Sequence, residues 1–411
     1  MKKSSKRLTR KLLAATMAST LALVGLDQSP ALAELPGACL PPDYVPPDAT
    51  YAICAEPATE YDEQGFIVPP RGEPKPPTMP SRTGPSIADP DPSAPDPQPL
   101  TDFDTPTPEP VEPPPSTPCS TTAFTNDRFV TCQYHLFTSF LFRLDNPTTP
   151  VGTGIIRVVT RTTRSPKSRD WTVEFLVTTI DTFQEAALAN FRARLFITAC
   201  YNCITVQTAT DVRDIPKGVQ VSYTYRLRSE GTALVKAAHQ ARIVLTHPRA
   251  NVGQATSSLD TGLDTRCDTD PKIEGPGGCV YPNHTSTFRL PASNPDWNEV
   301  AVHILLAQVQ LPLHYGLRGL GRPLTRITND SWMKLNRRVA CFTVVADYPR
   351  TSCDEYPFAS TRQGAAFQGY DNTSREVVDN RDNSLAGKET SLFYSNYRIL
   401  SGDGFWVDTT G

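Results

Sequence analysis

The chain has 411 residues and a formal net charge of −3. Its length exceeds the usual size of one domain, so we expect more than one folded unit. Charged residues make up 20% of the chain, and no part of it beyond the first 33 residues is strongly basic. Any binding to a polyanion should therefore be modest and sensitive to salt, because it cannot depend on a dense basic surface.

Residues 1–33 have the composition of a cleavable secretory signal peptide. Basic residues come first, an uncharged stretch runs from Leu12 to Leu26, and the small-residue sequence Ala31-Leu32-Ala33 follows. The uncharged stretch is shorter than the roughly 20 apolar residues that a membrane-spanning helix needs, which favours cleavage over a permanent anchor. No later segment is long and apolar enough to span a bilayer. We predict a secreted, extracellular protein without stable membrane insertion.

Residues 34–118 are predicted to be an acidic, proline-rich linker. They contain 25 of the 40 prolines of the chain, together with 15 acidic and 3 basic side chains. A segment of this composition cannot bury enough apolar surface to offset its ordering entropy, and its prolines favour polyproline II. We expect a disordered, extended tether.

Ten cysteines fall into five neighbouring pairs along the sequence. In an exported protein the simplest arrangement bridges each neighbour, although spacing alone does not fix the connectivity. Cys200 and Cys203 also have the spacing of a redox or zinc half-site, but a zinc ribbon needs a second such pair, so we favour a small structural loop. The predicted disulfides join Cys39 to Cys54, Cys119 to Cys132, Cys200 to Cys203, Cys267 to Cys279, and Cys341 to Cys353.

Residues 119–292 are predicted to form a β-rich, sandwich-like module. Short runs rich in Val, Ile, Thr, Phe and Tyr alternate with turn-forming residues, which is typical of successive antiparallel strands. Such runs occur at 154–162, 171–179, 194–198, 218–227 and 242–246, and a short helix is expected within 183–191. The module shows no catalytic motif, and a polymer or another protein would be its partner.

Residues 293–411 are predicted to form an α+β domain. Asn294 can cap a helix that starts at Pro295, presents Val300 and Ile304 on an apolar face, and ends at Pro312. Further helices are expected at 330–340 and 384–396, with short strands at 376–378 and 405–407. The segment is long enough to have its own core.

Two polar clusters in this domain suggest chemistry. Asp354 and Glu355 are adjacent carboxylates, and an aromatic-proline step follows them. Adjacent carboxylates repel each other, so one of them usually has a cation, a buried partner or a raised pKa. The second cluster, Asp379-Asn380-Arg381-Asp382-Asn383, lies where a helix should start, and helix capping alone would explain it.

The amino-acid sequences of these segments resemble those of the deoxyribonuclease NucA/NucB family. The resemblance rests on Cys-Asp-Glu-Tyr-Pro-Phe-Ala-Ser-Thr at 353–361 and Leu-Ser-Gly-Asp-Gly-Phe-Trp-Val at 400–407, and it extends from about residue 294 to 407. Members of this family are secreted, metal-dependent, sequence-nonspecific endonucleases. The resemblance implies a ββα-metal finger, in which two strands and a helix present the active site.

The resemblance also assigns a general base. No His follows His314, so a His base within the finger is excluded, and the resemblance gives this role to Asp354. A carboxylate can accept a proton from water when a nearby metal helps the water to ionise.

The resemblance also implies that an Asn at the start of the helix of the finger is the metal ligand. The spacing favours Asn383 with Asp382 beside it, while Asp379 and Asn380 form a second copy of the dipeptide and remain an alternative. Oxygen ligands of this kind suit a hard divalent cation such as Mg²⁺ or Mn²⁺.

Arginines are the candidate contacts to the DNA backbone, because Arg forms bidentate bonds to phosphate. Residues 310–411 contain ten arginines, among them Arg326 and Arg398, but eleven acidic residues offset them. Arg338, Arg362 and Arg381 are the preferred contacts. Glu355 would either hold a metal-bound water or pair with one of these three, and the sequence leaves both readings open.

Two functions remain in competition on the sequence alone. The first is a secreted endonuclease acting on extracellular DNA, with RNA as a further substrate. The second is a noncatalytic extracellular or envelope binding protein with a degenerate nuclease fold. Gln363 supports the second, because relatives usually carry Glu at this position and that carboxylate would be needed if it positions metal or water.

Overall fold

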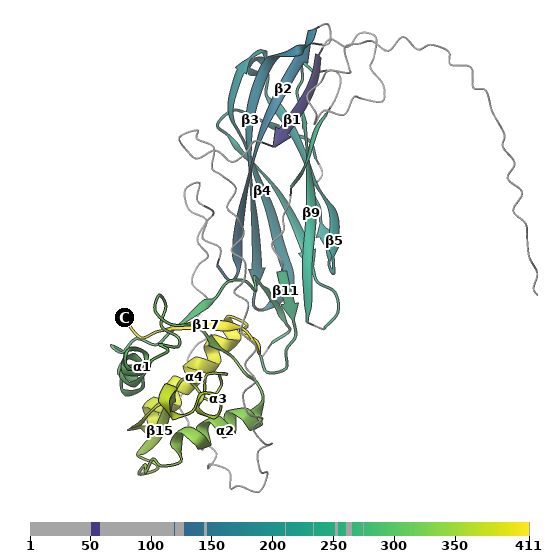
Figure 1. Ribbon diagram of the computed structural model, residues 1–411. Coiled ribbons are helices and arrows are strands. Elements are labelled where there is room, and N and C mark those ends of the chain that lie inside the picture. Colours follow the sequence, from purple (N-terminus) through teal and green to yellow (C-terminus); the bar gives the residue numbers. More distant parts are fainter. Residues whose placement is uncertain are drawn as a thin grey trace, which may run out of the picture.

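The computed structural model describes residues 51–57, 119, 127–143, 146–209, 211–232, 234–250, 254–259, 265–273 and 275–410. These residues form an elongated β-rich module and a smaller C-terminal α+β unit that packs against one end of it (Figure 1). Among the described residues, no helix has the length and apolar composition needed to cross a membrane.

Two antiparallel β-sheets build the module around a shared core. The first sheet has the strand order β1-β2-β3-β4-β8-β6, and the second has the order β12-β11-β9-β5-β7, with β10 pairing to β9. The strands are β1 (Tyr51–Pro57), β2 (Val130–Arg143), β3 (Asn146–Ser165), β4 (Ser168–Gln184), β5 (Phe191–Tyr201), β6 (Ile204–Gln207), β7 (Arg213–Ile215), β8 (Gln220–Arg228), β9 (Val235–Thr246), β10 (Ala255–Leu259), β11 (Thr265–Asp268) and β12 (Gly278–Val280).

Alternating side chains explain why these strands form. In β4 the buried residues Trp171, Val173, Phe175 and Val177 alternate with more exposed ones, which is the period of a half-buried strand. Buried residues of β8 extend this face within the same sheet, and buried residues of β5 and β9 supply the core side of the second sheet. The prediction of a β-rich module is confirmed, and each of the five predicted runs lies in a strand or overlaps one.

Two local predictions for this part of the chain need correction. Tyr51–Pro57 lies in the predicted tether, yet it forms β1 and pairs with β2 along its whole length. This stretch has proline only at its end, and Ala52, Ile53 and Cys54 are buried, so it has the apolar side chains that the flanking segments lack. The helix expected within 183–191 is only a single 3₁₀ turn, η2 (Glu185–Leu188), because β4 continues to Gln184.

The disulfides join cysteines that are close to each other in the sequence. Cys119 is bonded to Cys132, Cys200 to Cys203, Cys267 to Cys279, and Cys341 to Cys353. The Cys267–Cys279 bond joins residues that lie opposite each other in β11 and β12. The predicted Cys39–Cys54 pair cannot be assessed, because Cys39 lies outside the described residues.

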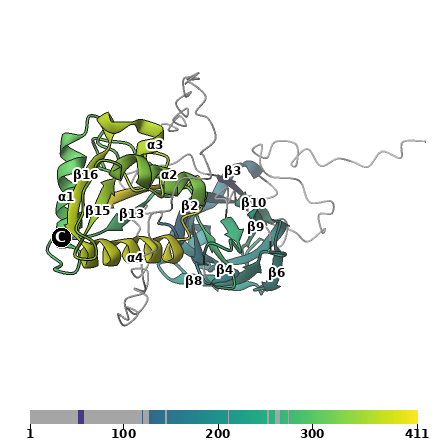
Figure 2. The same ribbon diagram turned by 90° about the horizontal axis from the view of Figure 1, so that it is seen from below.

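The C-terminal unit combines a three-stranded sheet, a two-stranded hairpin and helices that pack around them (Figures 1 and 2). Its core joins helix residues such as Val300 and Phe393 to strand residues such as Phe288 and Phe405. The elements are β13 (Ser286–Arg289), α1 (Asn298–Gln310), β14 (Leu324–Thr325), α2 (Asp330–Cys341), β15 (Thr351–Tyr356), α3 (Ala365–Gln368), η3 (Tyr370–Asn372), β16 (Ser374–Asp379), α4 (Asn380–Asn396) and β17 (Gly404–Asp408).

The unit starts earlier in the chain than residue 293. β13 runs parallel to β17 and is hydrogen-bonded to it, and Phe288 and Leu290 are buried in the C-terminal core. The first helix starts at Asn298 rather than Pro295, because the Asn294 side chain accepts the backbone N–H of Asp296 in the preceding turn. The last helix starts at Asn380, four residues before the expected position.

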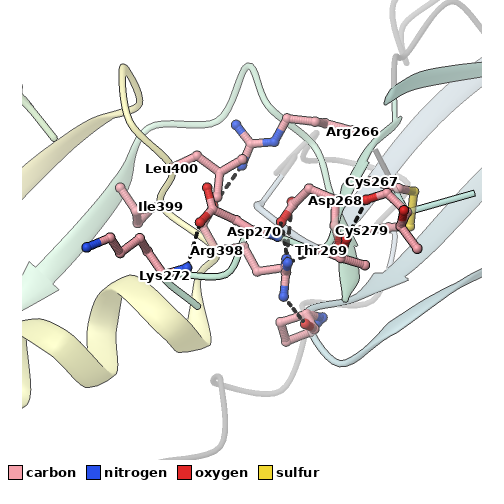
Figure 3. Close-up of polar contacts among 12 residues, drawn as sticks. Arg266, Cys267, Asp268, Thr269, Asp270, Lys272, Cys279, Arg398, Ile399 and Leu400 are labelled. Carbon is pink, nitrogen blue, oxygen red and sulfur yellow. Dashed lines mark hydrogen bonds and ion pairs between the residues drawn. A yellow bond between two sulfur atoms is a disulfide. The ribbon is translucent and has the colours of Figure 1, made fainter. Parts of the chain in front are cut away.

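Buried ion pairs join the two units across their junction (Figure 3). Arg398, in the loop between α4 and β17, is 1% exposed and binds the Asp268 carboxylate at the end of β11. Its Nη1 also donates to the backbone oxygen of Pro166, at 3.0 Å. Helix α4 is therefore followed, within two residues, by a side chain that is anchored in the β-rich module.

A second set of charges crosses the junction in the opposite direction. Arg128 and Arg266 from the module bind the Asp403 carboxylate, each with a contact of 2.6 Å, and both also donate to the backbone oxygen of Arg398. Burial alone would raise the pKa of Asp403, but the hydrogen bond from Arg266 and the two positive charges lower it below its ordinary value. The negative charge is thus retained inside the junction.

We expect Arg398→Met to lower the free energy of unfolding by about 3–5 kcal/mol, because it leaves Asp268 as a buried, unpaired charge. Urea unfolding measures this loss. Arg192→Met is the matched control: Arg192 pairs with Asp214 at 2.8 Å, but both side chains are at least half exposed, so its loss should stay below about 1 kcal/mol. Equal losses in the two variants would show that the buried ion pair at the junction stabilises the fold no more than an exposed one.

Candidate active site

The hairpin formed by β15 and β16 lies at the centre of the site. Successive residues of a strand point to opposite faces, so Asp354 and Glu355 separate even though they are adjacent in sequence. Asp354 contacts His303 on α1, whereas Glu355 lies beside Arg337 and Cys341 on α2. The two carboxylates are adjacent in the sequence, but they therefore lie on opposite faces of the hairpin and do not share one site.

Asp354 belongs to a short chain of buried polar contacts. Its Oδ2 lies 2.6 Å from Nδ1 of His303, and the other ring nitrogen, Nε2, lies 2.9 Å from Oγ of Ser374 on β16. Asp354 is 6% exposed and His303 is 4% exposed. The register of the hairpin places Ser374 opposite Tyr356, two residues beyond Asp354 and on the same face.

His303 is not among the residues predicted from the sequence, where a histidine base is excluded only within the finger. His303 lies on α1, 51 residues before Asp354. A signal was available, because Val300, His303, Ile304 and Ala307 share one helical face and the other three are apolar and buried. A histidine on a buried apolar face needs polar partners, and here they come from the hairpin.

Glu355 is buried on the opposite face of the hairpin. Burial raises the pKa of Glu355 to about 7, against the positive charge of Arg337, and the negative charge of Asp354 raises it further. Arg337 Nε lies 3.7 Å from the Glu355 carboxylate. The cation beside Glu355 is thus Arg337, and none of the three arginines considered from the sequence.

The polar cluster at the start of α4 includes residues that cap helices. Asp379 accepts the backbone N–H groups of Arg381 and Asp382, as an N-cap residue does. Glu299 of α1 accepts the backbone N–H of Asp379, and the Asp382 carboxylate accepts the backbone N–H of Glu299. Burial raises the pKa of Asp382. Asp379 and Asp382 therefore join the N-termini of α1 and α4.

Asn383 is the residue of the cluster that reaches the hairpin beside Asp354. Its Nδ2 donates to Ser352 Oγ at 3.0 Å and to the backbone oxygen of Cys353 at 3.2 Å. Asn380 lies one turn earlier on the same face of the helix, but it is only 2% exposed. Because both recorded bonds of Asn383 come from the nitrogen, its amide oxygen is the atom available to a ligand.

The donor atoms at this place decide which metal would fit. Among the described residues, no three His, Cys, Asp or Glu side chains gather in a way that could hold a metal ion. Asn383 offers one neutral oxygen, and the Asn380 Oδ1 atom is buried without a described partner. Such a sparse oxygen set suits a hard cation that keeps most of its waters and binds phosphate, rather than zinc.

The basic residues differ in what they can bind. Arg338 is half-buried and Arg362 is exposed, and neither forms an ion pair with a described residue, whereas Arg381 is paired with Asp296 at 2.7 Å. Arg326 and Arg398 are buried, and each donates to groups of the protein, so they are not phosphate contacts. Fewer of these five arginines are available to a phosphate than the sequence suggested.

Gln363 has a structural role. Its Oε1 accepts the backbone N–H of Thr325 at 2.9 Å, and its Nε2 approaches the Thr325 hydroxyl. Nearby, the Asn336 side chain donates to the backbone oxygens of Ala359 and Thr361, and a Cβ on Gly364 would lie 2.4 Å from it. Gln363 therefore helps to hold the loop after the hairpin strand, and it does not contact Asp354 or Asn383.

Comparison with known proteins identifies part of this unit. Residues 336–408 match the family Deoxyribonuclease NucA/NucB, which confirms the resemblance for the C-terminal region. The match supports a nuclease function in general. It begins inside α2, so β13, β14 and α1 lie outside it. No curated protein and no solved structure was found to match the chain.

The raised pKa of Glu355 predicts how stability depends on pH. An unfolded glutamate loses its proton near its ordinary pKa of 4.5, while the folded one keeps it up to about pH 7. Stability present below pH 4.5 is therefore lost as pH rises toward 7, by up to about 3 kcal/mol. Glu355→Gln should flatten this dependence in urea unfolding with EDTA, whereas Asp371→Asn, at an exposed carboxylate, should leave it unchanged.

The Cys341–Cys353 disulfide ties α2 to β15 one residue before Asp354. Replacing both cysteines by serine should lower the free energy of unfolding by about 2–3 kcal/mol, because the bond closes a loop with a sequence separation of 12. The same change at Cys200 and Cys203, with a separation of 3, should cost less. A larger loss from the second pair, measured by urea unfolding, would contradict this expectation.

Proposed function

We propose that the protein is a secreted, metal-dependent endonuclease that hydrolyses phosphodiester bonds of extracellular DNA without sequence preference. The observation that carries the proposal is the contact between Asn383 and the backbone oxygen of Cys353. It brings a carboxamide that could bind a metal next to Asp354, within the segment that matches a nuclease family.

Asp354 would act as the general base in this mechanism. Its carboxylate would accept the proton of a water molecule that attacks the phosphorus, and the 3′ oxygen would then leave. One carboxylate oxygen is bound to His303, so the other is the one that would face the water. Glu355 points away from this position, and its raised pKa favours the neutral form at mildly acidic pH.

Asn383 would hold the cation through its amide oxygen, while its nitrogen remains bound to β15. A hard divalent ion such as Mg²⁺ or Mn²⁺, when bound, supplies positive charge that stabilises the phosphate oxygens during hydrolysis. Arg338 and Arg362 would contact the DNA backbone. Because the unit has about as many acidic as basic residues, binding should be modest, and because its contacts to phosphate are electrostatic, it should weaken as salt is added.

Export accounts for features outside the site. The four disulfides between described cysteines are typical of an oxidising compartment, and the sequence of residues 1–33 fits a signal peptide. The β-rich module carries no catalytic group in this scheme, and a polymer or another protein remains its proposed partner.

Plasmid nicking with titrated Mg²⁺ and Mn²⁺ tests the proposal. Asp354→Asn should lower kcat by about 10²–10⁴-fold, which is the range for loss of a general base. Asn383→Ala should raise the metal concentration needed for half-maximal activity. Asp408→Asn, at the end of β17, is the control and should keep wild-type activity.

The alternative of a noncatalytic binding protein predicts a different result in the same assay. Nicking by the intact protein would then be absent with every metal, while retention of DNA on a filter could persist. Metal-dependent nicking that survives Asp354→Asn would instead leave the nuclease function standing and remove Asp354 as the base.

A further inference from the structure

We infer that His303 is a positioning residue for Asp354, and that Ser374 fixes the imidazole ring for this task. The inference rests on the proposed function, because it concerns the residue proposed as general base. It goes beyond the segment that matches the family, because His303 lies outside residues 336–408.

Three separate elements supply the three groups. α1 contributes His303, β15 contributes Asp354, and the first residue of β16 contributes Ser374. The distances of 2.6 Å and 2.9 Å are those of hydrogen bonds, and both side chains of the first contact are more than nine-tenths buried. A ring bound at both nitrogens cannot rotate without losing one bond.

The position of the ring proton follows from the role of Asp354. A carboxylate that accepts a proton from water has none to donate, so Nδ1 of His303 must carry the proton between them. In the neutral ring, Nε2 then accepts the Ser374 hydroxyl. The opposite arrangement, in which a protonated Asp354 donates to Nδ1 and Nε2–H donates to Ser374, would leave Asp354 unable to act as a base.

The bond from His303 has two effects on Asp354. It stabilises a buried carboxylate that would otherwise lack a charge-assisted partner in the described structure. It also occupies Oδ2, so that the remaining oxygen is the proton acceptor. His303 itself touches no substrate in this scheme, and its effect on rate is entirely through Asp354.

A matched pair of variants tests the inference in the intact chain. His303→Asn keeps an N–H donor close to the position of Nδ1, while His303→Leu has the same branched shape without a donor. Leu also suits the apolar face formed by Val300, Ile304 and Ala307, so the fold should persist and can be checked by urea unfolding.

We expect His303→Leu to lower kcat for plasmid nicking by roughly ten- to a hundredfold with KM unchanged, which corresponds to loss of one hydrogen bond to a charged group. His303→Asn should restore most of this loss. Ser374→Ala should have a smaller effect than His303→Leu, because it removes only the second contact. Equal activity of the Leu and Asn variants, whether both full or both lost, would overturn the inference.

A spectroscopic measurement tests the same arrangement without any activity. The ¹⁵N spectrum of the folded protein, assigned by comparison with His303→Asn, should show Nδ1 of His303 carrying a proton. A proton on Nε2 alone would overturn the inference. If the intact chain nicks no DNA while Nδ1 carries the proton, the proposed function fails and the hydrogen-bond arrangement stands. If nicking persists in Asp354→Asn, the role of Asp354 fails instead.

Discussion

Fixation of α4 at both ends is the constraint on which the rest of the C-terminal unit depends. At its start, Asn383 is bound to β15, and Asp379 and Asp382 exchange hydrogen bonds with Glu299 of α1. At its end, the loop that carries Arg398 and Asp403 is held by charges of the β-rich module. The helix therefore has one position relative to the hairpin, and the distance between Asn383 and Asp354 follows from that position.

The hairpin gives two chemically similar carboxyl groups different surroundings. Asp354 is hydrogen-bonded to His303 and lies on the face toward α1, while Glu355 is buried toward α2 with Arg337 at 3.7 Å. Environments of this kind separate the protonation behaviour of neighbouring acids. One strand can thus present a proton acceptor on one side and a mostly neutral acid on the other at mildly acidic pH.

The sequence predicted the features that depend on local patterns. Alternating residues such as those of β4 indicated the strands, and the spacing of the cysteines agreed with the observed disulfides. The motif around Asp354 indicated the family that residues 336–408 match. Contacts between distant segments could not be predicted in the same way. His303 reaches Asp354 only because α1 packs on the hairpin, and β1 joins β2 although most of its surroundings are rich in proline.

The buried ion pairs between the two units also could not be predicted from the sequence, because they join distant segments. Arg326 and Arg398 are among the candidate phosphate contacts that the sequence offers, since a sequence shows that a side chain is basic but not where it points. In the structure both are buried, and Arg398 has Asp268 as its partner 130 residues away. Gln363 was read as a lost catalytic group for the corresponding reason, and its contact with Thr325 indicates a structural role.

The boundaries of the matched segment have a consequence for its transfer into another protein. Residues 336–408 contain Asp354 and Asn383, but they lack the two strands that pair with β17 and the helix that supplies His303. They also contain Asp403 and Arg398 without the opposite charges that neutralise them. Moved alone into another protein, this segment would carry the family's motif with its supports missing. Transfer of residues 336–408 alone would therefore separate them from the groups of the β-rich module that hold them.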